Sequence, residues 1–371
     1  MKKKLAIIGA STGQYPLCQK ASELGIETFC FAWEKGAVCK DIVDHFYPIS
    51  IFDMDRIVEV CKSVGVDGVV SNASDITAEV TSYVAEKLHL VGTPYHVLKS
   101  LRDKFYVRTL TEPIKGLASL RYYRFDGQDR QIYPCVVKPC EGSGKKGVFF
   151  VRDKSDFEIA IKYASEDNAS GIIVEEFIDG KELSVESISS HGKHWVIQIT
   201  EKVSSSAPHF VELSHHQPAD ITVELRRKIE QVIPELLTAI GYTDGASHIE
   251  IKYRGNELYL IEANLRGGGG EISNKLVFMS SGIDYLKCII DVALNQFVEP
   301  LRINEPSFAG IYFLTKQTSN LLTFFANAEG NDWLVEKKIH STELMESHSN
   351  YERNGYLIYN ANHKVIPNLD C

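Results

Sequence analysis

Residues His248–Gly270 read "HIEIKYRGNELYLIEANLRGGGG". Two runs of strand-forming residues are joined by Arg254-Gly255-Asn256, which is typical of a tight turn, so the stretch predicts a β-hairpin. Glu250 and Glu262 lie within these largely apolar runs. An ionised carboxylate on a half-buried sheet is costly unless it is paired. The hairpin therefore requires a cation beside its two glutamates.

The register of the hairpin indicates which cation this is. If the chain reverses at Gly255, Glu250 lies opposite Leu260. Glu262 is then diagonal to Glu250, and Asn264 shares their face. Two carboxylates and an amide oxygen suit one or two Mg²⁺ ions, or Mn²⁺, that complete their shells with phosphate oxygens. A structural ion pair with a nearby arginine is the alternative interpretation.

A second stretch, residues 136–151, reads "VVKPCEGSGKKGVFFV". Lys138 ends an apolar strand, and a glycine-rich loop at 141–147 leads directly into another strand. Such a hairpin can fold over phosphates with its backbone N–H groups and its two further lysines. A flexible surface hairpin would share this composition. Lys138 favours the phosphate site, because an ammonium at the end of a buried strand itself needs an anion.

A third stretch, residues 174–186, reads "VEEFIDGKELSVE". A strand ends in Glu175-Glu176, the chain turns at Asp179-Gly180, and a strand with Glu182 and Glu186 follows. Carboxylates and free backbone groups at a strand end are what an adenine edge and a ribose diol require. Taken alone, the segment would suit a glutamate-rich surface hairpin.

The last 70 residues are expected to form strands near 310–315 and 355–361. Residues 1–95 alternate short apolar strands with helical stretches, such as 54–64, which predicts a parallel sheet with helices on both faces. Ligands collect at the carboxyl ends of such strands, here Gly9–Gly13 and Ser71–Asp75. The turn "GASTGQ" lacks the second glycine of a dinucleotide fingerprint, so no nicotinamide site is expected. The turn suits either a small polar substrate or a plain strand-to-helix connection.

The composition excludes several classes of protein. The chain has 371 residues, a net charge of −9 and eight cysteines without a C-x-x-C pair. The charge argues against nucleic acid as the main partner, and the cysteine spacing argues against a zinc site or a redox motif. No signal peptide is expected, and no stretch has the ~20 apolar residues of a membrane span. We therefore expect a cytoplasmic protein that binds neither nucleic acid nor membrane.

In this order, the motifs resemble those of the ATP-grasp superfamily. The resemblance rests on Lys104 in "RDKFYVR", Lys138 in "VVKP", the glycine hairpin, "EEFIDGKELSVE" and "EIK…IEANLRGGGG", and it covers nearly the whole chain. It implies α/β and α+β domains: a Rossmann-like pre-ATP-grasp domain (1–98), a two-lobed ATP-grasp domain (99–300) with a mobile lid at about 120–180, and a small β-rich C-terminal cap (301–371).

The resemblance also implies how ATP would be bound. Lys104 and Lys138 would hold the phosphates, Glu175 would meet the adenine amino group and Glu182 would hold the ribose. The metal would lie at Glu250, Glu262 and Asn264, as the hairpin itself predicts. Further contacts, mostly from the backbone, are expected at Gly142, Ser143, Gly144, Gly147, Glu176, Phe177 and Ile178.

Residues 204–222, "SSSAPHFVELSHHQPADIT", resemble the F-x-E-x-x-H-x-x-P loop of bacterial ATP-grasp amino-acid ligases. The resemblance places Glu212 and His215 at the substrates, with Glu212 favouring an ammonium group, and Arg266 at the acyl phosphate. His209 and His216 have no matching role and are expected to be exposed loop residues. Substrate contacts are also expected at Ser71, Asp75, Gly268 and Gly269.

The resemblance therefore implies an ATP- and Mg²⁺-dependent carboxylate–amine ligase of the amino-acid or dipeptide type. It would activate a carboxylate as an acyl phosphate and release ADP and phosphate. Its partners would be a small carboxylate, a small amine and a second copy of the chain in a homodimer. The alternatives are a purine-pathway or carboxylase-like ATP-grasp enzyme, or a nucleotide-binding sensor without turnover.

Overall fold

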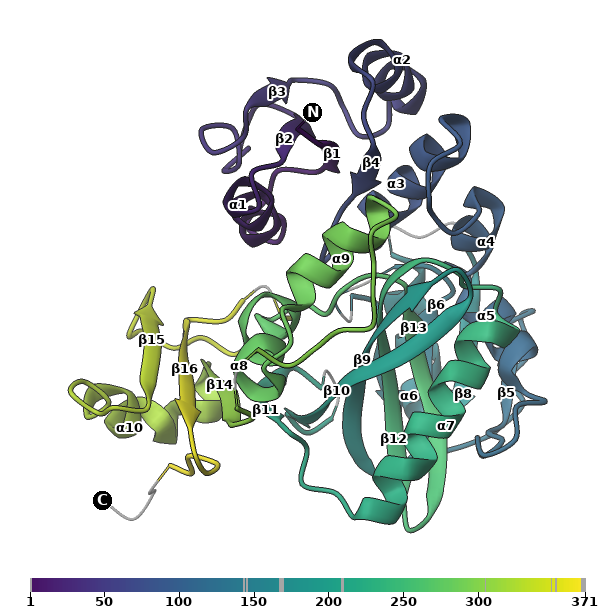
Figure 1. Ribbon diagram of the computed structural model, residues 1–371. Helices are drawn as coiled ribbons and strands as arrows, with labels where there is room; N and C mark the ends of the chain where they lie inside the picture. Colours follow the sequence, from purple (N-terminus) through teal and green to yellow (C-terminus); the bar gives the residue numbers. More distant parts are fainter. Residues whose placement is uncertain are drawn as a thin grey trace.

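The computed structural model describes residues 2–142, 144, 146–166, 170–207, 210–303, 305–347, 349–350 and 352–367. Three β-sheets with surrounding helices organise this part of the chain (Figure 1). The N-terminal sheet occupies one end of the molecule, and the C-terminal strands lie well away from it. Mixed α/β and α+β architecture, as expected from the sequence, is confirmed.

The N-terminal part contains β1 (Lys4–Ile8), α1 (Tyr15–Glu23), β2 (Glu27–Phe31), β3 (His45–Tyr47), α2 (Met54–Val64), β4 (Gly68–Val70) and α3 (Asp75–Lys87). Its strands are parallel in the order β3-β2-β1-β4. Leu5 and Ile7 pack into one apolar cluster and Ala6 and Ile8 into another, because this sheet is covered on both faces. The predicted parallel sheet is confirmed, and the ends of β1 and β4 meet at one edge.

A small antiparallel sheet follows the helices α4 (Tyr95–Ser100) and α5 (Lys104–Thr111). It consists of β5 (Tyr122–Arg124), β8 (Ile172–Glu176), β6 (Cys135–Pro139) and β7 (Phe149–Val151), in that spatial order. Helix α6 (Lys154–Ser165) covers one face through Phe157, Ala160 and Ala164. The two inner strands, β8 and β6, place Glu175 and Lys138 on the opposite face, which borders a cleft described below.

The central sheet begins with β9 (Lys181–Ser190), β10 (Lys193–Ser204), β11 (Glu212–Gln217), β12 (Gly245–Arg254) and β13 (Glu257–Asn264). Its apolar face packs against α7 (Val223–Ala239). Side chains alternate along a strand, so Ile249 and Ile251 join that core while His248 and Glu250 project from the opposite face. The polar face is further covered by η1 (Ile272–Leu276), α8 (Val277–Ser281) and α9 (Tyr285–Ala293).

The C-terminal strands extend the central sheet. They are β14 (Phe308–Leu314), β15 (Leu334–Ile339) and β16 (Gly355–Ala361), with η2 (Lys316–Leu321) and α10 (Leu322–Ala326) between them. Since β14 pairs with β11, the eight strands run in the order β13-β12-β9-β10-β11-β14-β16-β15. The strands expected at 310–315 and 355–361 are confirmed, and the domain boundaries stay predictions.

The register predicted for the β12–β13 hairpin is wrong. Glu250 lies directly opposite Glu262, two residues from the predicted partner Leu260. The turn contains both Gly255 and Asn256, and Ile261 is an extra residue in a β-bulge, so each feature shifts the pairing by one. The prediction that both carboxylates share one face is confirmed, because directly paired residues project to the same side.

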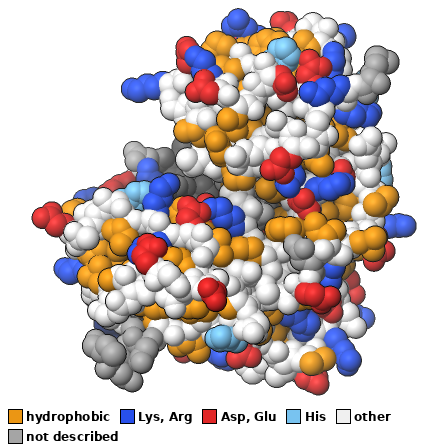
Figure 2. Space-filling model, turned by 60° about the vertical axis from the view of Figure 1, so that its left-hand side comes forward, with side chains coloured by type: hydrophobic (Ala, Val, Ile, Leu, Met, Phe, Trp, Pro, Cys, Tyr) orange, Lys and Arg blue, Asp and Glu red, His pale blue; other side chains and the backbone are white. Residues whose placement is uncertain are grey.

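The surface carries charges of both signs. Figure 2 shows acidic and basic side chains interspersed over the visible face, which is hollowed between its upper and lower parts. None of the described helices combines the length and the apolar composition that crossing a bilayer requires.

Candidate active site

A cleft between the small sheet and the central sheet gathers most of the residues predicted to bind the nucleotide. Strands β6 and β8 form one wall, and β9, β12 and β13 form the other. The predicted nucleotide and metal residues that line it are Lys104, Lys138, Gly142, Glu175, Glu176, Phe177, Ile178, Glu182, Glu250 and Glu262. Residues as far apart in the sequence as Lys104 and Glu262 therefore converge on one space.

The glycine hairpin borders this cleft through Gly142, whose backbone has a positive φ of 125°. Gly147 packs against Pro139, and a β-carbon there would lie 2.8 Å from the proline Cγ. Gly144 has a φ of 68°, which favours glycine. Ser143 lies outside the described residues, so its predicted backbone contact stays a prediction.

Glu175 is buried between two cations. Arg108 approaches it with Nε at 2.5 Å and Nη2 at 3.2 Å, and the Lys138 ammonium lies 2.6 Å away. Burial would raise the pKa of Glu175, but Arg108 and Lys138 outweigh burial and hold the pKa at about 2. Burial is the larger influence on Lys138 and lowers its pKa in spite of Glu175. The ammonium is therefore poorly compensated and suited to meeting a further anion.

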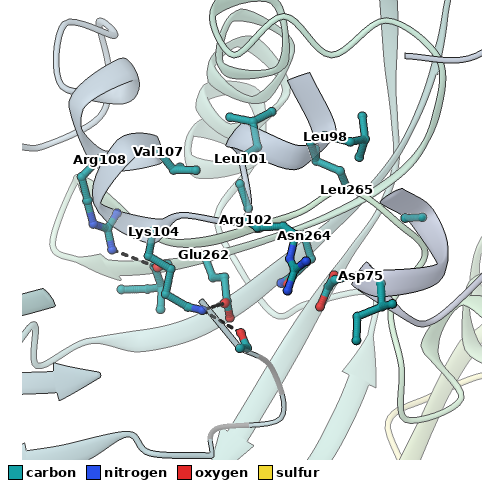
Figure 3. Close-up of a pocket in the computed structure, with 15 residues that line it drawn as sticks. Asp75, Leu98, Leu101, Arg102, Lys104, Val107, Arg108, Glu262, Asn264 and Leu265 are labelled. Atoms are coloured by element: carbon teal, nitrogen blue, oxygen red, sulfur yellow. Dashed lines mark hydrogen bonds and ion pairs between the residues drawn. The ribbon is translucent and has the colours of Figure 1, made fainter. Parts of the chain in front are cut away.

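Lys104, at the start of α5, connects three parts of the site. Its ammonium lies 3.1 Å from Oε1 of Glu262 and donates to the carbonyl of Gly142 at 2.7 Å. Figure 3 shows the Lys104 and Glu262 side chains pointing toward one another. Burial opposes the charge on Lys104, yet Glu262 outweighs it and raises the pKa. The contact places a cation between the metal candidate on β13 and the glycine hairpin.

A second cavity adjoins the cleft and shares Lys104, Gly142 and Glu262 with it. One wall is apolar, with Leu98, Leu101, Val107 and Leu265. The other wall is polar and includes Asp75, Arg102 and Asn264 (Figure 3). The Lys104–Glu262 ion pair therefore lies at the boundary between the cleft and the second cavity and presents charged groups to both.

The metal candidates lie on adjacent strands. Glu250 is directly opposite Glu262, and His248 is directly opposite Asn264. Among the described residues, no group of three His, Cys, Asp or Glu side chains is gathered closely enough to hold a metal alone. Two carboxylates and an amide oxygen nevertheless fit Mg²⁺, which keeps several sites for water and phosphate. The donor set therefore fits the ion in company with nucleotide phosphates.

Glu250 is fixed by two neighbours. The Lys202 ammonium lies 2.7 Å from its Oε1, and His248 Nε2 lies 3.3 Å from the same oxygen. The other nitrogen of His248 is 2.6 Å from Glu186. Burial would lower the pKa of His248, but Glu186 and Glu250 outweigh it and raise the pKa to about 9. The doubly engaged imidazolium orients the Glu250 carboxylate toward the cleft side of the sheet.

Arg266 and Asp75 form an ion pair that joins the central sheet to the N-terminal part of the chain. Arg266 follows β13, Asp75 begins α3, and Nε of the arginine is 3.0 Å from the carboxylate. Burial opposes the charge on Arg266, but Asp75 and nearby glutamates outweigh it and raise the pKa. The structure thus brings together the predicted catalytic arginine and one predicted substrate residue.

The other predicted substrate residues, Ser71, Gly268 and Gly269, differ in how much room the structure leaves beside them. The Ser71 hydroxyl contacts the carbonyl of Ile8 and the hydroxyl of Thr77, both at 2.7 Å, so it also ties β4 to β1 and α3. Gly268 lies tightly against His248 and Glu186, where a β-carbon would come within 3.0 Å of both side chains. A β-carbon on Gly269 would meet no atom of the described chain within 4 Å. Gly269 is therefore the glycine of this run with room beside it.

Glu212 and His215 lie on β11 in a buried polar cluster. Oε1 of Glu212 is 2.7 Å from Lys202, and Oε2 is 3.3 Å from Nε2 of His215 and 3.0 Å from Nη2 of Arg353. Burial is the largest influence on His215 and lowers its pKa despite Glu212. The Lys202 ammonium contacts both Glu212 and Glu250, so it links this cluster directly to the metal candidate.

The expectation for His216 is wrong. It is not an exposed loop residue but a buried residue of β11, where Nδ1 contacts the Tyr359 hydroxyl at 3.0 Å and Nε2 contacts the Ser214 hydroxyl at 2.9 Å. The pairing of β11 with β14, which the sequence pattern did not predict, encloses it. His209 lies outside the described residues.

Four residues with central contacts were not predicted from the sequence: Arg108, Lys202, His248 and Arg353. A usable signal existed for Arg108, which lies four positions after Lys104 and so shares its helix face. For His248 the signal was its two-residue spacing from Glu250 on one strand face. Lys202 and Arg353 have no such local signal, since their partners lie on other elements.

Comparison with known proteins identifies the architecture. Residues 131–275 match the model of the ATP-grasp domain. The chain is 26% identical over 272 residues to alanine–anticapsin ligase of Bacillus subtilis, covering 64% of this chain and 56% of that protein. It is 24% identical over 249 residues to the carbamoyl phosphate synthase large chain of Thermotoga petrophila, covering 64% of this chain but 22% of that protein.

The fold extends the similarity to nearly the whole chain. The structure of an L-amino acid ligase from Bacillus licheniformis superposes with a TM-score of 0.79 and 23% identity, covering 98% of this chain and 94% of that one. The chain spans only about a fifth of the length of the carbamoyl phosphate synthase large chains that it matches.

Proposed function

The chain contains an ATP-grasp domain, and from this premise we propose that it is an ATP- and Mg²⁺-dependent carboxylate–amine ligase. It activates a carboxylate as an acyl phosphate, which an amine then attacks to give an amide, ADP and phosphate. The single observation that carries the proposal is the cleft in which Lys104, Lys138, Glu250 and Glu262 surround one space, joined through Lys202 to Glu212. The similarity to two amino-acid ligases supports the same choice.

The nucleotide end of the cleft supplies both recognition and charge. Glu182 and the backbone of residues 176–178 line the cleft and offer acceptors and donors for ribose and adenine. Lys104 and Lys138 hold positive charge where phosphates would lie, which favours phosphoryl transfer mainly by positioning and electrostatics. Glu175 serves this arrangement by keeping Lys138 in place.

The metal supplies neutralisation of phosphate charge when it is bound, and Glu250, Glu262 and Asn264 would hold it. Lys202 and His248 fix Glu250, while Lys104 fixes Glu262. These three cations offset the repulsion between two neighbouring carboxylates on one face of the sheet.

The substrates meet beyond the phosphates. Arg266, held by Asp75, stabilises the oxyanion of the acyl phosphate and of its tetrahedral successor. The open side of Gly269 allows backbone to approach that anion. Glu212 binds the ammonium of the amine substrate, and His215, whose pKa burial lowers, remains neutral beside it and accepts a proton.

The proposal includes small-molecule substrates, a homodimer and a cytoplasmic location. A screen of phosphate release over pairs of amino acids, with products identified by mass, tests the activity directly. We expect ATP-dependent release with at least one pair, and a product whose mass equals the two substrates less one water. Release that requires a phosphorylated ribosyl amine or bicarbonate instead of a second amino acid would contradict the ligase proposal.

A further inference from the structure

Arg353 reaches into the predicted amine site from the C-terminal strands. It lies two residues before β16, and its guanidinium is stacked 3.6 Å from the ring centroid of Phe313 on β14. The same ring lies edge-on to His215, with 5.3 Å between centroids. The Phe313 ring therefore contacts both Arg353 and His215, at the junction of β11, β14 and β16.

The contacts of Arg353 converge on one residue. Its Nη2 donates to the carboxylate Oε2 of Glu212 at 3.0 Å and to the backbone carbonyl of Glu212 at 3.1 Å. The backbone N–H of Glu212 in turn donates to the side-chain oxygen of Asn350 at 3.1 Å. The segment before β16 thus fixes both the backbone and the carboxylate of Glu212, the residue predicted to bind the ammonium.

The guanidinium is not fully satisfied by these contacts. Its Nε is buried, and among the described residues no acceptor forms a hydrogen bond with it. Burial lowers the pKa of Arg353 in spite of Glu212. A buried N–H donor without a partner is costly, and a guanidinium has a fork of donors that matches a carboxylate. The Arg353 guanidinium therefore has donor capacity for an anion beyond its contact with Glu212.

An α-amino acid presents complementary charges. Its ammonium and carboxylate are attached to the same carbon, so a site that binds both needs an acceptor and a donor side by side. Glu212 and Arg353 are such a pair, in direct contact with each other. In this structure Arg353 takes the place beside Glu212 that the ammonium of an amino acid would have, and Glu212 takes the place of its carboxylate beside Arg353.

We propose that Arg353 binds the α-carboxylate of the amino acid whose ammonium Glu212 receives, so that the amine substrate is a free amino acid. This inference rests on the proposed ligase function and specifies its acceptor. Binding exchanges the Glu212–Arg353 ion pair for two pairs with the substrate. The acceptor keeps its carboxylate in the product, so no bond to that group forms or breaks.

The test compares an acceptor amino acid with its C-terminal amide at a saturating concentration of the carboxylate donor. For the wild-type protein, the acid should have a lower KM than the amide. In Arg353→Gln the KM for the acid should rise roughly 10- to 100-fold while that for the amide changes less than about threefold, since only the acid loses a charge-assisted contact. Arg353→Lys should fall between, because it keeps the charge and loses the fork.

Arg130→Gln provides a matched control. Arg130 also forms an ion pair, with Asp126 at 2.9 Å, and stacks on Tyr123 at 4.8 Å, but it is half exposed on the small-sheet side. In Arg130→Gln, the ratio of the KM for the acid to the KM for the amide should equal that of the wild type. Equal KM increases for acid and amide in Arg353→Gln, or no increase, would overturn the inference, and Arg353→Lys answers the question if the glutamine variant does not fold.

Failure of the two proposals can be told apart. A wild-type protein that forms amide products but does not distinguish acid from amide would refute the role of Arg353 and leave the ligase function standing. A wild-type protein that forms no product with any amino-acid pair would refute both.

Discussion

Glu175, the buried carboxylate of the cleft, shows how single charges set the chemistry. Two cations hold its pKa at about 2, below its ordinary value of 4.5. A carboxylate whose pKa is depressed on folding contributes stability that is present above pH 4.5 and lost as the pH falls toward 2. The pair of cations thereby keeps a fixed negative charge beneath the predicted adenine site at any physiological pH.

Replacement of Lys138 tests this arrangement. Lys138→Ala should weaken ATP binding by about 1.5–3 kcal/mol, the worth of a charge-assisted contact. It should also raise the pKa of Glu175, so that the variant loses less stability than the wild type as the pH falls from 4.5 toward 2. Calorimetric titration with ATP and urea unfolding between pH 2 and 6 measure the two effects. Lys146→Ala, on the glycine hairpin, should cost less, and equal losses in the two variants would show that the buried lysine is misassigned.

Glu262 is the carboxylate through which the metal assignment can be tested at constant size. Glu262→Gln should abolish turnover, because it removes one of two ionised metal ligands. Its unfolding temperature without nucleotide should remain near that of the wild type, since Glu262 is partly exposed and bonded only to Lys104 among the contacts described here. Glu257→Gln, an exposed change on the same strand, is the control. Substantial phosphate release by Glu262→Gln would reject the metal role.

Individual residues were predictable to different degrees. Lys138, Glu250 and Glu262 each lie in an apolar run where the charge is conspicuous, whereas Lys104 lies in a charged segment and was predicted from the resemblance of "RDKFYVR". Arg353 carries no such mark, since it lies in a polar segment and becomes buried only when β16 joins the sheet. Its role depends on a partner 141 positions away.

At the scale of elements, the bulge in β13 explains how the cleft is braced. At this bulge, Arg108 on α5 donates hydrogen bonds to the carbonyls of Leu260 and Ile261. The same guanidinium binds Glu175 on β8. One side chain therefore links α5 and both sheets across the nucleotide cleft.

Arg108→Gln should consequently destabilise the fold more than it disturbs chemistry. The loss in unfolding free energy should be about 3 kcal/mol, because a buried ion pair is broken and two carbonyls lose their donor. Chemical denaturation measures it, with the exposed Arg121→Gln as control. A loss below about 1 kcal/mol would show that Lys138 alone suffices for Glu175.

The bounds of several elements were predictable from the sequence, whereas the register and pairing of some strands were not. The helix at 54–64 and the strand at 355–361 have the predicted bounds, because their apolar patterns end at clear turn residues. The hairpin register was not predictable, because it depends on a two-residue turn and a β-bulge that the apolar pattern does not mark. The sequence also gave no sign that β14 would pair with β11, since edge pairing is decided by tertiary packing.

At the scale of the whole molecule, three parts of the chain meet at the predicted substrate site. The N-terminal sheet contributes Asp75, the central sheet contributes Glu212, Glu250 and Arg266, and the C-terminal strands contribute Arg353. The order of motifs predicted the first two contributions. The third follows from the continuous central sheet, which carries the end of the chain back to the predicted amine site.

The central claim is that ATP activates a carboxylate by transfer of its terminal phosphoryl group. Chromatography of the nucleotide formed during turnover, with the amide product confirmed by mass, tests it most directly. Lys104, Lys138, the glycine hairpin and the two carboxylates proposed to hold the metal line one cleft, so we expect ADP and inorganic phosphate in equal amounts with the amide. AMP and pyrophosphate as the main products would contradict the account.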